Sequence, residues 1–151
     1  RRTIRPPRMS SAARRTPPPP STERGVDVPA SILKAAKDGQ VGAVLAWIDG
    51  GGWFDATFEF TFDDGSRESG MSLLMVAMGN GHVGLAEALL RRGADVSLLT
   101  GRGGSALILA ATNGCDKMVE LALRHGAEID QRNKFGNTAL INAANNGHER
   151  V

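Results

Sequence analysis

The sequence predicts an all-α solenoid of stacked helix-turn-helix units, preceded by a tail that does not fold. Two observations lead to this prediction. From residue 70 onward, glycine, hydroxyl, leucine and alanine residues recur every 33 positions without a gap, and a period of this length is typical of repeat proteins. Before the repeats, the first 20 residues contain six of the seven prolines. With 151 residues, 41% of them hydrophobic, the chain can build one packed domain.

The predicted tail comprises residues 1–25. Residues 1–22 contain six arginines and no acidic residue, so their charge of +6 contrasts with −4 for the other 129 residues. Proline fixes φ and lacks an N–H donor, and like charges repel one another, so little offsets the entropy lost on ordering. We expect a disordered segment with a short polyproline II stretch at 17–20.

We favour a solvated terminus for this tail, although three functions compete with that interpretation. The spacing Arg14-x-x-Pro17-x-x-Pro20 is that of an SH3-domain ligand. An arginine-rich stretch without acids is also typical of a cleaved organelle transit peptide, and a basic arm could bind phosphates nonspecifically. The chain starts with Arg1 rather than methionine, which leaves the natural start of the protein open.

A first repeat is predicted at 29–69, and it contains an insertion. Residues 31–39 and 41–48 have the pattern of a helix pair, and the lysines and acids on its outward face suit a repeat that caps the stack. Three phenylalanines then alternate with polar residues and end at a turn motif, Phe58, Phe60 and Phe62 before Asp63-Asp64-Gly65. We expect a lengthened β-finger whose aromatic face folds back over the first repeat. A partner site is the alternative, because residues 49–70 contain six acids and one arginine.

Three further units are predicted at 70–102, 103–135 and, shortened, 136–151. In each, a serine or threonine can cap the first helix, and a leucine and an alanine three residues later share one face. The matching positions are Ser72, Ser105 and Thr138; Leu74, Leu107 and Leu140; Ala77, Ala110 and Ala143. Asn-Gly pairs end these helices, and amphipathic second helices follow at 82–92 and 115–125. Helices this short are stable only when packed against their neighbours.

The last unit stops just after its second helix would begin, at Val151. Half a repeat exposes an apolar surface that a complete repeat array hides with a capping unit. We therefore expect the chain to be a fragment of a longer repeat protein.

These units resemble the ankyrin repeat over residues 29–151. The segment 138–148 (Thr-Ala-Leu-Ile-Asn-Ala-Ala-Asn-Asn-Gly-His) is similar to the family's first-helix signature, and residues 93–97 and 126–130 are similar to its G-A-x-V-N segment. The family's usual T-P-L-H is replaced, for example by Ser-Ala-Leu-Ile at 105–108. The resemblance implies a protein-binding domain without a cofactor, which uses a concave groove of finger tips and first helices.

Mapped onto this sequence, the resemblance predicts a partner-binding surface on two fingers and two first helices. The predicted finger residues are Arg102, Gly104, Arg132, Asn133, Lys134, Phe135 and Asn137. The predicted helix residues are Leu109, Thr112, Asn142 and Asn145. Together they offer a charged anchor, an apolar anchor and adaptable hydrogen bonds, as protein interfaces require.

No catalytic or metal-binding residue is predicted. The glycines at 101–104 lack the lysine of a phosphate-binding loop. His82 and His148 share one repeat position after Asn-Gly, which favours a structural role at the helix junction. Cys115 occupies the third such position, and no histidine stands at helical spacing to activate it.

We therefore expect a non-enzymatic scaffold that is intracellular, and cytoplasmic unless the basic N-terminus directs it to an organelle. We expect its partner to be another protein. We expect it to bind no nucleic acid, cofactor or metal and to have no membrane span. The alternatives are a regulatory segment of a larger enzyme or channel, and an organelle-targeted protein whose basic N-terminus is removed.

Overall fold

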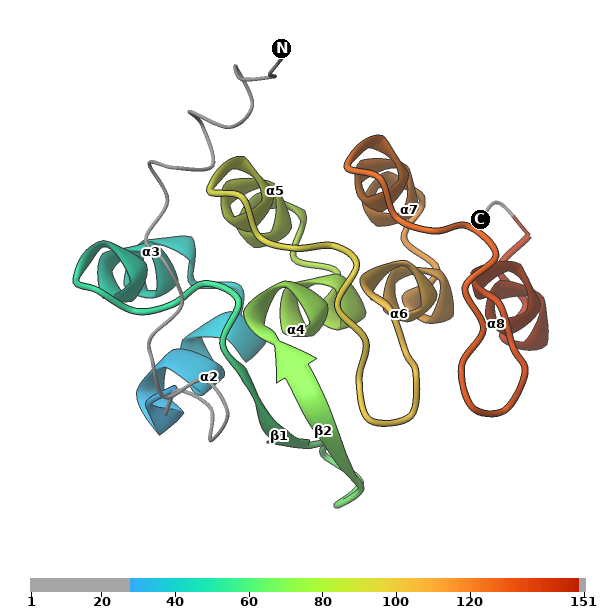
Figure 1. Ribbon diagram of the computed structural model, residues 1–151, viewed down its shortest axis with the longest axis horizontal. Coiled ribbons are helices and arrows are strands. Elements are labelled where there is room, and N and C mark those ends of the chain that lie inside the picture. Colours follow the sequence, from blue (N-terminus) through green and yellow to red (C-terminus); the bar gives the residue numbers. More distant parts are fainter. Residues whose placement is uncertain (1–27, 150–151) are drawn as a thin grey trace, which may run out of the picture.

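The computed structural model describes residues 28–149, so the predicted tail, including its SH3-type motif, lies outside the described part. Seven helices in these residues form two layers (Figure 1). The first helices of the units are α2 (Ala30–Lys37), α4 (Leu73–Asn80), α6 (Ala106–Asn113) and α8 (Ala139–Asn145). The second helices are α3 (Val41–Asp49), α5 (Val83–Arg91) and α7 (Asp116–Arg124).

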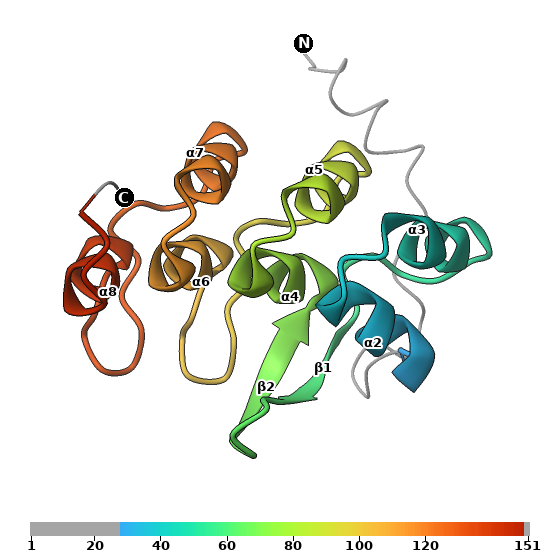
Figure 2. The same ribbon diagram turned by 180° about the vertical axis from the view of Figure 1, so that it is seen from behind.

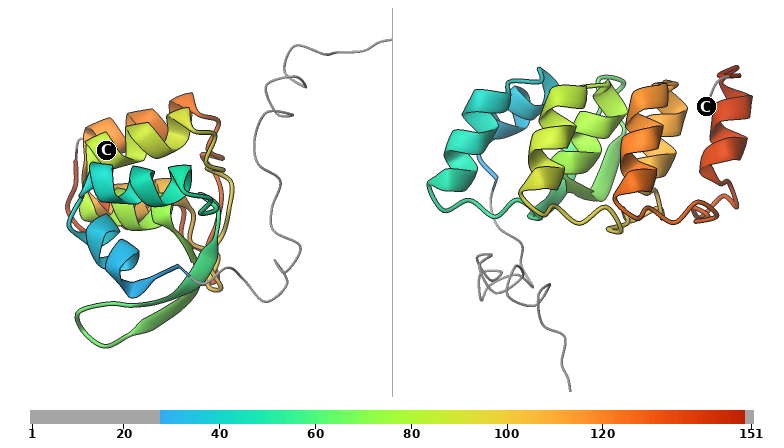
Figure 3. Two further views of the ribbon diagram at one scale, coloured as in Figure 1. Left: turned by 90° about the vertical axis from the view of Figure 1, so that its left-hand side faces the viewer. Right: turned by 90° about the horizontal axis from the view of Figure 1, so that it is seen from above.

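The helix pairs stand side by side in chain order. The first helices form one row and the second helices the other, and the same order is seen from above (Figures 1 and 3). Each first helix contacts the first helices of its neighbours, and α3, α5 and α7 do the same in their layer. The stacked helix-turn-helix solenoid predicted from the 33-residue register is therefore present.

The sequence determines both ends of the first helices. The hydroxyls of Ser72, Ser105 and Thr138 each accept a hydrogen bond from the backbone N–H three residues later, at 3.2, 3.1 and 3.2 Å. Each bond satisfies one of the donors left unpaired at a helix N-terminus. At the other end, Gly81 and Gly114 adopt φ of 77° and 75°, the left-handed conformation that glycine adopts without strain.

The core lies between the two layers and between adjacent units. Leu107 is 1% exposed, and Ala77 and Ala110 are fully buried. Alanine at these two positions lets adjacent first helices approach closely, as the sequence pattern indicated. The block from Met71 to Met78 is buried without interruption, so α4 is at the centre of the stack.

The fold is not strictly all-α, because the insertion forms a two-stranded antiparallel sheet. Strands β1 (Thr57–Thr61) and β2 (Arg67–Ser72) pair with an irregularity between Phe58 and Phe60. The period-two phenylalanine pattern of the insertion is that of a half-buried strand and explains the difference from the predicted fold class. We call this element the hairpin.

The hairpin packs against the first repeat. Phe60 is 5% exposed, and its ring lies 5.1 Å from that of Phe62, centroid to centroid. From α2, the Lys37 ammonium lies 5.7 Å from the Phe60 ring centroid and 2.6 Å from an Asp63 carboxylate oxygen. Strand β1 lies between β2 and α2 when the molecule is seen from behind (Figure 2). The aromatic face therefore folds back over the first repeat, as expected.

Candidate partner-binding groove

Two adjoining cavities form a groove between the first helices and the projecting loops. The hairpin cavity, of about 250 Å³, lies between the hairpin, α4 and α6, and its lining includes Phe60, Met75 and Gly79. The finger cavity, of about 210 Å³, lies between the hairpin, α6, α8 and the finger loops. The two cavities share Phe62, Met71, Leu109 and Thr112. The hairpin and the loops project beyond the helix layers on this side (Figure 3).

Backbone hydrogen bonds hold the projecting loops next to one another. The Gly101 N–H donates to the Ser69 carbonyl at 2.8 Å, and the Lys134 N–H donates to the Arg102 carbonyl at 2.8 Å. The two bonds are one repeat apart and involve no side chain. We call them the finger ladder, and they fix the spacing of the loops along the groove.

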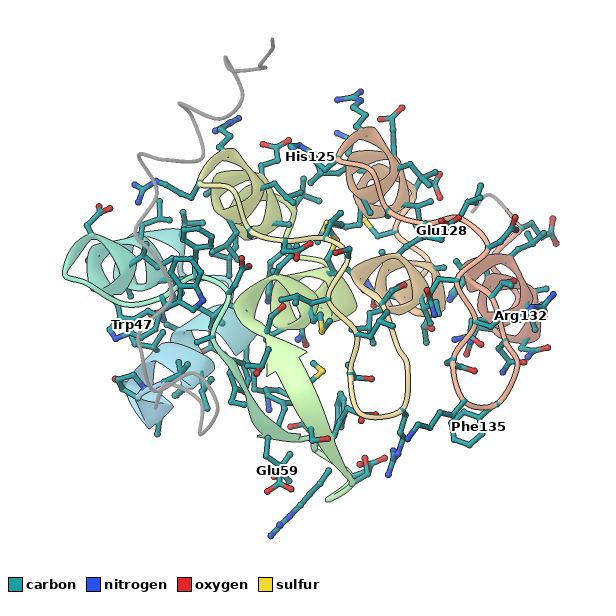
Figure 4. The ribbon with its side chains drawn as sticks, in the orientation of Figure 1. Trp47, Glu59, His125, Glu128, Arg132 and Phe135 are labelled. Atoms are coloured by element: carbon teal, nitrogen blue, oxygen red, sulfur yellow. The ribbon has the colours of Figure 1, made fainter. Side chains whose placement is uncertain are left out.

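The finger cavity brings together most of the residues predicted to bind a partner. The predicted residues that line it are Arg102, Gly104, Leu109, Thr112, Asn133, Phe135 and Asn142. Phe135 is 72% exposed at the tip of its finger, below the row of first helices in Figure 4. Across the helices, the Asn142 amide donates to the Thr112 hydroxyl at 3.1 Å. The groove therefore combines an exposed aromatic ring with hydroxyl and amide groups.

Four predicted residues do not line either cavity: Arg132, Lys134, Asn137 and Asn145. Arg132 donates to the carbonyl of Gly136 at 2.8 Å and so stabilises its own finger. The Asn133 carboxamide accepts from the backbone N–H groups of Phe135 and Asn137 at 2.9 and 3.0 Å. In this finger, Arg132 and Asn133 therefore maintain the loop that presents Phe135.

Several groove residues were not predicted from the sequence. Val76 and Gly79 of α4 occupy the positions one repeat before Leu109 and Thr112, so the 33-residue register could have identified them. Phe60 and Phe62 of the hairpin could not be found this way, because they precede the register, although their aromatic face was the alternative partner site. Met71 lies one repeat before Gly104, so the register could have identified it as well.

The charged groups around the groove are paired with one another. Lys37 binds Asp63 at the hairpin cavity, and the Arg102 guanidinium lies 3.8 Å from the Glu68 carboxylate. Glu68 also accepts from the backbone N–H of Arg102 at 3.2 Å. At the hairpin turn, hydrogen bonds from the side chain and then the backbone of Ser66 hold the pKa of Asp64 below its usual value. At least one partner in each ion pair is more than half exposed, so these pairs add little to the stability of the fold.

The histidines connect units rather than form a reactive site. The Nε2–H of His82 donates to the Lys37 carbonyl at 2.6 Å, and that of His148 donates to the Thr112 carbonyl at 3.0 Å. Nowhere in residues 28–149 do three or more His, Cys, Asp or Glu side chains gather as metal ligands would. Within that same range, no helix has the length and apolar character needed to cross a bilayer.

A comparison with protein-family models agrees with this architecture, whereas a search of curated proteins finds no match. A family model of ankyrin repeats in three copies matches residues 32–133 and 73–151, and together the two matches cover well over half of the chain. Ankyrin repeats are generally protein–protein interaction modules. With stacked helix pairs, projecting fingers and this match, the chain belongs to the ankyrin-repeat family.

Proposed function

We propose that this protein is a non-catalytic interaction module that binds a segment of a partner protein in the groove. One observation carries the proposal: finger and first-helix residues from separate units converge on a single cavity next to the exposed Phe135 ring. Exposed aromatic side chains beside polar groups are typical binding anchors, because they offer large contact area with few rotatable bonds.

A peptide-display selection tests this proposal. The full chain is immobilised, a random peptide library is selected against it, and the dissociation constants of the enriched peptides are measured by calorimetry. Phe135→Ala should weaken binding by about 1–3 kcal/mol, the usual contribution of an aromatic anchor. The thermal unfolding midpoint should stay unchanged, since the ring is mostly exposed.

Ile129→Ala is the matched control, because Ile129 is also an exposed apolar residue, 58% exposed, and lines neither cavity. This variant should bind the selected peptides as the original protein does. Equal affinity of Phe135→Ala and the original protein would place the binding surface outside the groove.

A further inference from the structure

Gly79 is a glycine that the fold does not require. It lies in the last turn of α4, and it is not among the glycines with positive φ. A Cβ atom at this position would meet only the Leu109 Cβ, at 3.9 Å, which is an ordinary van der Waals contact. Glycine within a helix costs about 0.5–1 kcal/mol relative to alanine. Neither the backbone nor the packing of α4 accounts for this cost.

The missing side chain opens the hairpin cavity. Lys37, Gly79 and Thr112 occupy the same repeat position, two residues before the glycine that ends each first helix. All three line the hairpin cavity, whereas their equivalent in α8, Asn145, lines neither cavity. Only glycine contributes no side chain there, and the space between the hairpin and α4 stays open as a result.

The lining of this cavity is mostly apolar and rich in groups that favour aromatic rings, and Asn80, Thr112 and Asn113 are its uncharged polar members. Its walls include Phe60, Phe62, Met71 and Met75. Methionine sulfur makes favourable contacts with aromatic rings, and methionine adapts its shape to an occupant. An apolar cavity of about 150 Å³ can hold a benzene molecule, so about 250 Å³ has room for a phenyl or phenol ring.

The charges at this cavity favour an uncharged occupant. Lys37 and Asp63 are the charged residues among those lining it, and they pair with each other at 2.6 Å. A charged group entering the cavity would lose hydration without gaining a free counterion. A neutral ring would lose only apolar hydration and leave the ion pair intact.

We infer that the hairpin cavity is an anchor pocket for one uncharged aromatic side chain of the partner protein. This inference deepens the proposed function and rests on it for the source of the ring. A partner segment held there would continue along the groove through the residues that the two cavities share, toward Phe135.

The pocket can be tested without the partner, with p-cresol as the probe for a tyrosine side chain. The methionine methyl groups of the full chain are labelled with ¹³C, and their NMR signals are followed as p-cresol is added. The signals of Met71 and Met75 should shift and saturate, because both side chains, 2% and 1% exposed, line the pocket within reach of the ring current of a bound aromatic group. Benzylamine, which carries a positive charge, should shift them far less at equal concentration.

Gly79→Leu should fill the pocket and weaken p-cresol binding by about tenfold or more. Its thermal unfolding midpoint should be no lower than that of the original protein, because the cavity accepts the side chain and the helix gains propensity. If this variant does not fold, Gly79→Ala provides the same test with a smaller side chain, and p-cresol affinity should still fall. Gly42→Leu is the matched control, since Gly42 is an exposed helix glycine with no atom within 4 Å of its added Cβ.

Two results would overturn the inference: no saturable shift of Met71 and Met75, or equal p-cresol affinity in a folded Gly79→Leu variant. The peptide selection separates this failure from that of the proposed function. Selected peptides that depend on Phe135 but bind Gly79→Leu unchanged would contradict the anchor pocket and leave the groove as the binding surface. If no peptide is selected, the proposed function fails, while p-cresol binding abolished by Gly79→Leu still supports an aromatic pocket.

Discussion

At the scale of single residues, the position after each Asn-Gly pair connects one unit to the preceding one. His82 and His148 each donate from Nε2 to a backbone carbonyl 45 and 36 residues earlier. The sequence predicted the structural role, because the two histidines share one register position. It could not identify the acceptors, since a backbone carbonyl carries no residue-specific signal. Cys115 occupies the same position in the middle unit and lacks a comparable donor.

Cys115→His should therefore stabilise the protein. By register, the new ring would donate to the carbonyl of Gly79 and lie over Gly81, as the His148 ring lies over Gly114. The exposed Asn113 side chain, now close to Gly81, would have to move aside. We expect the free energy of unfolding in urea to rise by about 1 kcal/mol, the net value of one hydrogen bond.

Cys115→Ala is the control for loss of the thiol alone, and its unfolding free energy should not increase. A Cys115→His variant no more stable than Cys115→Ala would show that the carbonyl of Gly79 is out of reach.

At the scale of helices and strands, the local sequence pattern predicted the bounds of the second helices closely. The pairing of the strands depends on long-range contacts. The second helices were predicted at 82–92 and 115–125, and the structure has Val83–Arg91 and Asp116–Arg124. The difference is one capping residue at each end. His82, Cys115 and His125 have non-helical dihedrals, whereas Arg92 keeps helical ones. The strand irregularity at Phe58–Phe60 was not predictable, because it depends on pairing with residues across the hairpin.

The alanine of α6 provides a test of helix packing. Ala110→Leu should destabilise the protein by about 1–3 kcal/mol, because the fully buried Cβ contacts adjacent helices and the added atoms overpack them. Thermal or urea unfolding measures the change. Ala144→Leu is the control in α8, at an exposed position, and should alter stability by less than about 0.5 kcal/mol. A fully stable Ala110→Leu variant would contradict the close packing of the first helices.

At the scale of the whole molecule, burial is uneven along the stack. Leu107 and Ile108 of α6 are 1% and 3% exposed, whereas their equivalents in α8, Leu140 and Ile141, are 69% and 36% exposed. Because each unit is stabilised by its neighbours, a helix covered on one side contributes less to the cooperative core. The central helices α4 and α6 have neighbours on both sides.

Hydrogen exchange should follow this gradient. In a protein of residues 1–151, amide groups of α8 should exchange at least about tenfold faster than those of α4 and α6, since local opening needs less free energy where fewer contacts are lost. Mass spectrometry of peptide fragments after timed labelling in heavy water measures this order. Exchange in α8 as slow as in α6 would indicate that the stack unfolds only as one unit.

The groove was predictable as far as the repeat register extends. The ankyrin resemblance predicted Leu109, Thr112 and Asn142 on one surface, and the structure brings them together with Phe135. The hairpin was expected to fold back over the first repeat, but the contacts that hold it there, the burial of Phe60 and the Lys37–Asp63 pair, were not predictable. Those contacts join α2 to the hairpin, and the 33-residue repeat does not relate these two segments.

In the finger ladder, the backbone holds the loops in place, whereas the side chains of the loops form their exposed surface. The bonds from Gly101 to Ser69 and from Lys134 to Arg102 use peptide groups alone, so they do not depend on the side chains of Arg102 and Lys134. Substitutions at Arg102 or Lys134 can therefore change the chemistry offered to a partner while the scaffold keeps its shape. Randomising Arg102 and Lys134 would therefore give a set of variants that share one backbone frame and differ only in the chemistry of their finger tips.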